Sequence, residues 1–150
     1  MKKVKVLIGI ISVGTLILIA LGIVVARFDT IQTNTAATAE LRRDLKKLVP
    51  SISKTEIIYR RPGLFIYVYT KEKLDESTAG QVLDRVKQYV TDATMKDLSM
   101  RVDGGTNGFL AVSLEVYSTD RQNPDYAFNT HYDSTNQRGP YHVWDEVPLG

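Results

Sequence analysis

The sequence contains no cysteine, and this absence removes several classes of protein at once. It excludes disulfide-stabilised secreted domains, thiol catalysis and cysteine-ligated zinc sites. The chain has only two histidines, His131 and His142. His131 and Asp133 supply two ligands on one predicted strand face, whereas a zinc site uses three or four, and the spacing brings no third ligand to them. We therefore expect no metal site.

Catalytic motifs are also missing. The chain has no G-x-S-x-G nucleophile elbow and no H-E-x-x-H pair. The glycine-rich stretch "DGGTNG" (residues 103–108) lacks the Lys and Ser/Thr of a phosphate-binding loop and leads into a predicted strand. Asp84 and Asp92 fall on the polar side of a predicted helix, where solvated carboxylates are the ordinary interpretation. We expect a protein that is not an enzyme and that needs no cofactor.

One long apolar run dominates the N-terminal part of the chain. The 21 residues 6–26, "VLIGIISVGTLILIALGIVVA", hold no charge. As a helix they would extend roughly 30 Å, the thickness of a bilayer's hydrocarbon core. A cleaved signal peptide is the alternative, but its apolar region usually has about 7–15 residues. The length favours a retained transmembrane anchor, and either interpretation exports the rest of the chain.

The charges beside this run indicate its orientation. Lys2, Lys3 and Lys5 precede it in a basic flank (residues 1–5), and Arg27 follows it. Positive residues prefer the cytoplasmic side, so we expect a cytoplasmic N-terminus and an extracytoplasmic C-terminal domain in a single-pass cell-membrane protein. Of 19 basic residues, four lie at or before Arg27, which leaves 15 against 17 acidic ones. That balance of −2 gives no support to nucleic-acid binding.

Residues 27–50 are expected to form a juxtamembrane stalk and a short helix. The stretch "DTIQTNTAATA" is poor in large apolar residues, and Leu41, Leu45 and Leu48 then fall on one helical face before Pro50 ends the pattern. This face has two interpretations. It could begin a coiled coil that continues backwards through Thr38, or it could pack on the following domain.

Residues 51–133 are expected to form the folded domain. Residues 55–61 and 64–70 have the β-branched and aromatic content of strands, and "RPGL" between them predicts a turn in which Gly63 has a positive φ. A helix is predicted over residues 78–95, capped by Asp75 or Ser77. The residues of its apolar face are Ala79, Val82, Leu83, Val86, Val90 and Ala93.

Two further strands follow the glycine-rich stretch. In the first, Leu110, Val112, Leu114 and Val116 share a face, and Phe109 lies on the wetter side; the second covers residues 126–132. A polar tail, residues 134–150, could pack on the domain through an edge segment "YHVW". The order helix, hairpin, helix, hairpin predicts an α+β fold, a small two-layer sandwich with an antiparallel sheet.

The strand at residues 64–70 has no wet face. It reads Leu-Phe-Ile-Tyr-Val-Tyr, so both of its sides are bulky and largely apolar. One side would meet the long helix. The other needs a second cover, and the candidates are the Leu41/Leu45/Leu48 helix, the tail with Trp144, or another protein. The third would make the side that holds Phe65, Tyr67 and Tyr69, or the opposite side, a binding surface.

We therefore expect a membrane-anchored extracytoplasmic interaction module, an accessory or scaffold component of a bacterial cell-envelope assembly of the secretion or conjugation type. Its partners would be other envelope proteins or a second copy of itself. The alternative is a ligand-binding or sensing module that recognises cell-wall glycan or peptide. Aromatic side chains stack on sugars, and the candidates for that role are Tyr117, Tyr126, Tyr132 and Trp144.

Overall fold

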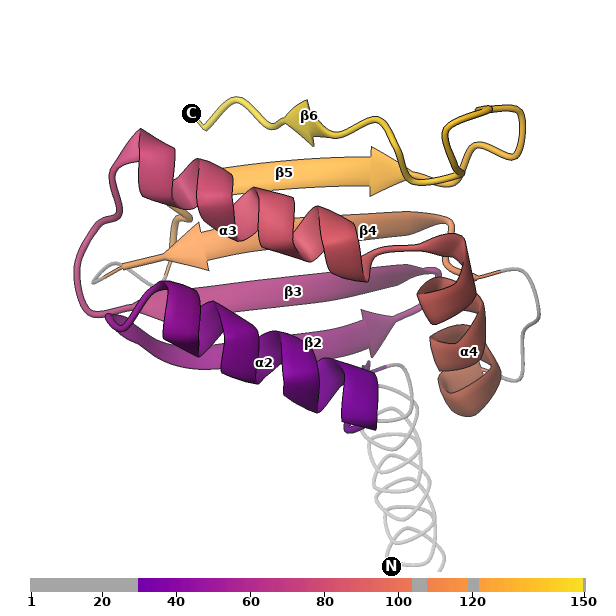
Figure 1. The fold of residues 1–150 in the computed structure, drawn as a ribbon, viewed down its shortest axis with the longest axis horizontal. Helices are drawn as coiled ribbons and strands as arrows, with labels where there is room; N and C mark the ends of the chain where they lie inside the picture. The colour runs from indigo at the N-terminus through magenta and orange to yellow at the C-terminus, as the bar shows by residue number, and fades with distance from the viewer. Residues whose placement is uncertain (1–29, 104–107, 119–121, 150) are drawn as a thin grey trace, which may run out of the picture.

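A six-stranded sheet, covered on one face by helices, forms the centre of the computed structural model, which describes residues 30–103, 108–118 and 122–149. The strands follow one another in the sheet in chain order (Figure 1). They are β1 (Thr30–Gln32), β2 (Ile52–Arg60), β3 (Gly63–Thr70), β4 (Ala111–Tyr117), β5 (Tyr126–His131) and β6 (Asp145–Glu146). The predicted α+β class is confirmed.

The sheet is mixed. Strands β2 and β3 form one antiparallel hairpin and β4 and β5 another, as predicted, but β3 and β4 are parallel. The prediction of a wholly antiparallel sheet was therefore wrong. The physical reason is the long connection over residues 71–110, which crosses the helical face and returns to the end of the sheet where β3 began.

Helix α2 (Ala36–Leu48) belongs to the folded domain. Thr35 caps it: the Thr35 hydroxyl accepts from the Thr38 N–H, and the Thr38 hydroxyl accepts from the Thr35 N–H. Leu41 and Leu45 are completely buried in the core. These leucines pack on the sheet, so they are not available as the seam of a coiled coil.

The helix predicted over residues 78–95 is two helices, α3 (Glu76–Tyr89) and α4 (Asp92–Asp103). Asp75 caps α3 as predicted. The break follows Val90, whose backbone leaves the helical region, and the Thr91 hydroxyl accepts from the Thr94 N–H to start α4. The sequence pattern missed this break because the apolar spacing continues across it.

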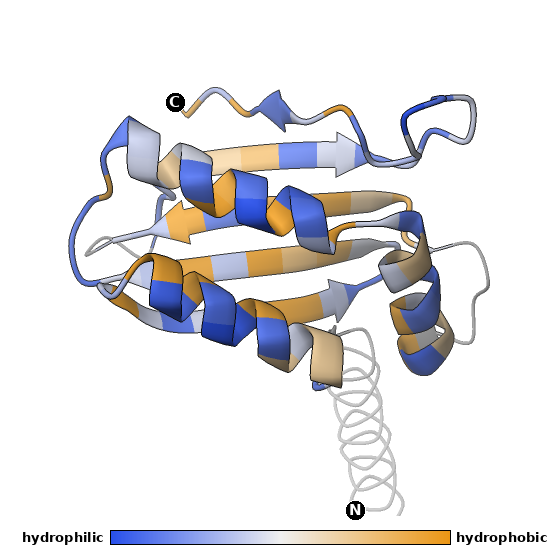
Figure 2. Cartoon of the chain, viewed as in Figure 1, coloured by the Kyte–Doolittle hydropathy of each residue, from blue (hydrophilic) through white to orange (hydrophobic). Residues whose placement is uncertain are grey.

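The core lies between the sheet and the pair α2 and α3, which lie side by side on one face, while α4 lies at one end (Figure 1). Figure 2 shows strongly apolar central strands beneath helices whose outward turns are polar. The inward residues of β3 and β4 are almost completely buried; they are Leu64, Ile66, Val68, Val112, Leu114 and Val116. Leu110, expected with them, precedes β4 and is 64% exposed.

The C-terminal tail packs on the domain. Tyr141 is buried, and its hydroxyl accepts from the Phe109 N–H at 3.0 Å and donates to the Phe109 carbonyl at 2.7 Å. Phe109, expected on the wetter side, is buried instead, with its ring centroid 5.3 Å from that of Tyr59. The edge strand is β6, which pairs with β5 just after the expected "YHVW" segment.

The turn between β2 and β3 differs from its prediction. Gly63 does not have a positive φ; it pairs with Arg60 as the first residue of β3, and the Arg61–Pro62 peptide bond is cis. A Cβ at Gly63 would lie 3.4 Å from the Ala111 carbonyl oxygen on the parallel neighbour β4. This is an ordinary van der Waals distance, so neither a positive φ nor a steric clash requires glycine at this position.

Within the described part of the chain, no helix has both the length and the apolar character needed to cross a membrane. The predicted anchor, residues 6–26, lies outside the described residues.

Leu45→Ala is expected to lower the free energy of unfolding by about 2–5 kcal/mol, because it leaves a cavity beneath α2. Leu48→Ala, three residues further along the same helix and 40% exposed, is the matched control and should change it by less than about 1 kcal/mol. Denaturant unfolding of the purified chain, followed by the fluorescence of its single tryptophan, measures both. Equal effects would contradict the docking of α2.

Two glycines should respond in opposite directions to alanine. Gly108 has φ +79°, and an added Cβ would lie 2.7 Å from the Tyr141 hydroxyl, so Gly108→Ala should destabilise the fold by about 1–2 kcal/mol or more. Gly80 lies in α3 with no atom within 4 Å of an added Cβ, so Gly80→Ala should stabilise it by about 0.5–1 kcal/mol. Thermal unfolding compares them; a stabilising Gly108→Ala would contradict the contact with Tyr141.

Candidate functional site

One face of the sheet is left open by the helices. Both α2 and α3 lie on the opposite face, and among the described residues no helix covers this one (Figure 1). The side chains of β3 show the difference: Leu64, Ile66 and Val68 are completely buried, whereas Phe65, Tyr67 and Tyr69 are half-buried. Neither the α2 helix nor the tail provides the second cover for β3 that the sequence required.

Four aromatic rings form a continuous cluster on this open face: Phe65, Tyr67, Tyr69 and Tyr117, hereafter the aromatic cluster. The Phe65 and Tyr67 ring centroids are 6.1 Å apart. Tyr117 contacts both Tyr67, at 6.2 Å, and Tyr69, at 5.5 Å. The rings of Phe65 and Tyr67, and those of Tyr69 and Tyr117, are stacked with interplanar angles of 20° and 24°. Tyr67 lies edge-on to Tyr117, with an interplanar angle of 61°, and this contact joins the two stacked pairs.

The parallel pairing of β3 and β4 assembles this cluster. In its register, Tyr67 lies opposite Glu115 and Tyr69 lies opposite Tyr117. Residues directly opposite each other on adjacent strands point to the same face of the sheet. Tyr117, which the sequence suggested for sugar stacking, therefore joins the three β3 aromatics that the sequence suggested as an interaction surface.

Charged side chains of both signs surround the cluster. The Lys54 ammonium lies 5.8 Å from the Tyr69 ring centroid, and the Arg60 guanidinium lies 5.7 Å from that of Phe65. Lys54 also pairs with Glu56 at 2.6 Å. Sequence reasoning missed these flanking residues, although their alternation along β2 places them on one strand face. The surface therefore has an aromatic centre and a polar rim, the usual organisation of a protein interface.

The hydroxyls of Tyr67 and Tyr117 remain protonated at neutral pH. Burial, followed by hydrogen bonding and proximity to the Glu115 carboxylate, raises the pKa of Tyr117, whose hydroxyl donates to Glu115. Burial, followed by the Glu115 charge, also raises the pKa of Tyr67. Both hydroxyls therefore keep their protons, and neither is a candidate base.

The other aromatic candidates do not join the cluster. The Tyr126 hydroxyl donates to the Leu74 carbonyl at 2.9 Å, and Tyr132 packs edge-on against Tyr141, with ring centroids 5.6 Å apart. The Trp144 indole N–H donates to the Tyr141 carbonyl at 3.0 Å, and its ring packs against the core. Tyr126, Tyr132 and Trp144 thus hold the C-terminal half of the domain together.

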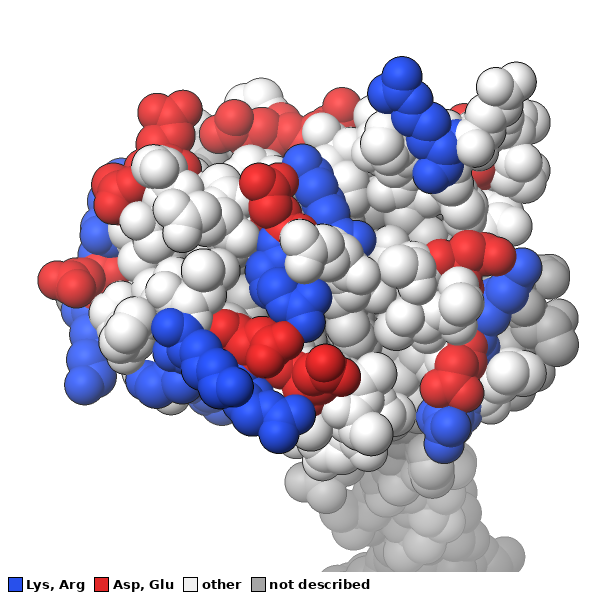
Figure 3. Space-filling model, in the orientation of Figure 1, with Lys and Arg blue, Asp and Glu red and all other residues white. Residues whose placement is uncertain are grey.

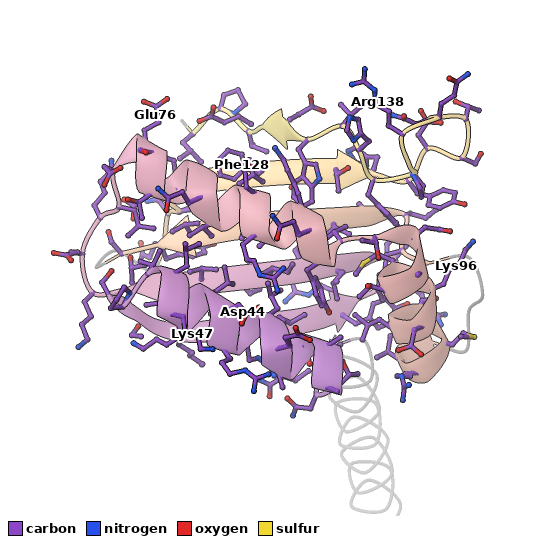
Figure 4. All side chains as sticks on the ribbon, in the orientation of Figure 1. Asp44, Lys47, Glu76, Lys96, Phe128 and Arg138 are labelled. Atoms are coloured by element: carbon purple, nitrogen blue, oxygen red, sulfur yellow. The ribbon has the colours of Figure 1, made fainter. Side chains whose placement is uncertain are left out.

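The charged groove between α2 and α3 is a second surface feature. Its floor holds the Asp44–Arg85 ion pair, with 2.5 Å between the carboxylate oxygen and the guanidinium nitrogen. The hydrogen bond from Arg85 lowers the pKa of Asp44. Asp44 and Lys47 lie on the α2 side of this groove (Figure 4). Basic side chains lie along this part of the surface (Figure 3), and the basic residues of α2 are Arg42, Arg43, Lys46 and Lys47.

The carboxylates of this groove are paired with basic side chains. Asp44 is neutralised by Arg85, and Asp84 on the groove wall pairs with Lys87 at 3.6 Å. Across the described ranges there is no group of three or more His, Cys, Asp or Glu side chains positioned to hold a metal ion. The aromatic cluster is therefore the feature of the described surface that most needs an explanation.

Comparisons of the chain with protein-family models, with curated proteins and with solved structures gave no match.

Glu115→Gln is expected to lower the pKa of Tyr117 and of Tyr67 toward the ordinary value of about 10, because the neutral amide no longer opposes formation of a nearby phenolate. The decrease should be partial, since burial is the larger cause for both rings. Titration of ¹³C-labelled tyrosines by NMR measures the change. Glu72→Gln, at an exposed position, is the control, and an unchanged Tyr117 titration would contradict the contact with Glu115.

Proposed function

We propose that this protein is a single-pass membrane protein, anchored by residues 6–26 with its N-terminus in the cytoplasm. Its extracytoplasmic α+β domain binds a protein partner through the open face of the sheet. In this role it serves as an accessory or scaffold component of a bacterial cell-envelope assembly of the secretion or conjugation type. The observation that carries the proposal is the aromatic cluster on a sheet face that no described helix covers.

The composition of the open face supports a protein partner. Tyrosine and arginine are among the residues enriched at binding hot spots, and here Tyr67 lies centrally with Arg60 at the rim. A rim that includes Lys54, Glu56 and Glu115 provides charges of both signs, which set the register of a partner. A folded domain without a catalytic arrangement among its described residues has this face as its most distinctive surface.

Recognition of cell-wall glycan or peptide is the alternative. Sugars stack on exposed ring faces, whereas the rings of the cluster stack largely on one another. Tyr126, Tyr132 and Trp144 are occupied in structural contacts. These two observations favour the protein partner. If the protein sediments with purified cell wall, and substitution of Tyr67 and Tyr69 abolishes this, the result would favour the glycan instead.

Tyr67→Glu is expected to reduce partner binding roughly tenfold or more, because it introduces a charge at the centre of the aromatic cluster. Gln81→Glu, an exposed position on α3 and thus on the opposite face, is the matched control and should leave binding unchanged. Both full-length variants are isolated from the native host in mild detergent, their folding is checked by circular dichroism, and the copurifying proteins are quantified by mass spectrometry. A folded Tyr67→Glu variant that keeps all its partners would show that the open face is not the binding surface.

A further inference from the structure

The start of β1 places one end of the sheet close to the proposed anchor. Thr30, the first residue of β1, follows Ala26, the last apolar residue of the run, by four positions. Four residues extend at most about 14 Å. Thr30 pairs with Arg60 at the end of β2, so the turn between β2 and β3 is at the end of the sheet where the chain enters the domain.

This end of the sheet presents a small surface of mixed character. We call it the hairpin tip and define it as Arg60, Arg61, Pro62 and Leu110. Leu110 is joined to the turn, since its N–H donates to the Pro62 carbonyl at 3.2 Å. With 64% exposure, Leu110 is the most exposed of the large hydrophobic residues in the described part of the chain.

The charged residues of the hairpin tip are all basic. The segment from Tyr59 to Leu64 contains two arginines and no carboxylate. Neighbouring aromatic side chains orient both guanidinium groups: Arg60 lies over the Phe65 ring, and the Arg61 Nε donates to the Tyr59 hydroxyl at 3.3 Å. Both arginines are exposed. They are thus held at the end of the sheet beside an exposed leucine and an exposed proline.

We propose that the hairpin tip rests on the outer surface of the bilayer, with Arg60 and Arg61 binding phospholipid headgroup phosphates and Leu110 entering the interfacial region. Guanidinium groups bind phosphate in a bidentate manner, and an apolar side chain beside basic residues is the usual composition of a peripheral membrane contact. Because the connection from Ala26 to Thr30 is short, the hairpin tip is held close to the bilayer surface. This inference rests on the anchor in the proposed function.

The absence of native cysteine allows a direct test on the full-length chain. Leu110→Cys is labelled with a polarity-sensitive fluorophore, and the protein is reconstituted into phosphatidylcholine vesicles with or without phosphatidylglycerol. Lipids that carry a nitroxide on the headgroup then quench the fluorophore if it lies at the surface. Leu48→Cys, exposed at the C-terminal end of α2 and far from the tip, is the matched control (Figure 1).

Resistance of the protein to carbonate extraction first establishes that it has inserted. The expected result is several-fold stronger quenching at position 110 than at position 48, and weaker quenching at 110 when Arg60→Glu and Arg61→Glu are added. An inserted protein with equal quenching at both positions would overturn the tip contact and leave the proposed anchor intact. A protein that does not insert would overturn the anchor and, with it, this inference.

Discussion

The parallel pairing of β3 with β4 is the constraint on which the rest of the structure depends. It joins two antiparallel hairpins into one sheet and makes β3 and β4 the central strands. Because parallel neighbours need a crossover, residues 71–110 must pass over one face, and α3 lies in that crossover. Helix α2 fills the remainder of the same face. Helices α2 and α3 therefore both cover one face of the sheet, and the other face is left open.

An open sheet face that is rich in aromatic residues must remain compatible with water. Ring stacking within the aromatic cluster shields part of its apolar surface, and Lys54 and Arg60 extend over the outer rings. The Tyr117 hydroxyl donates a hydrogen bond to the Glu115 carboxylate and so supplies part of its hydrogen bonding. These contacts are local and lie near the surface, so a partner could replace them without disturbing the core, which is separately closed by α2 and α3.

Residue spacing and capping chemistry predicted part of the local structure. The inward Leu41 and Leu45 of α2, the strand at β3 and the Asp75 cap followed from period and residue type. The break between α3 and α4 and the conformation of the turn at Gly63 did not, and the remaining differences were decided by long-range contacts. Phe109 is buried with its ring against that of Tyr59, 50 residues earlier in the chain, and Tyr141, 32 residues away, binds both its backbone groups. The aromatic cluster was foreseen only on β3, because the position of Tyr117 depends on a strand orientation that no local signal specifies.

The proposed anchor and the open face are connected by the geometry of the sheet. If the end that carries Arg60 and Arg61 rests on the bilayer, the strands rise from the membrane, because β2 runs towards that end and β3 away from it. The aromatic cluster, which lies along β3 and β4, then faces sideways, parallel to the membrane plane. A partner that meets it from the side is most simply another protein held in the same membrane. Confinement to one plane raises the effective concentration of two such proteins, so a single sheet face of moderate area is enough for a specific contact.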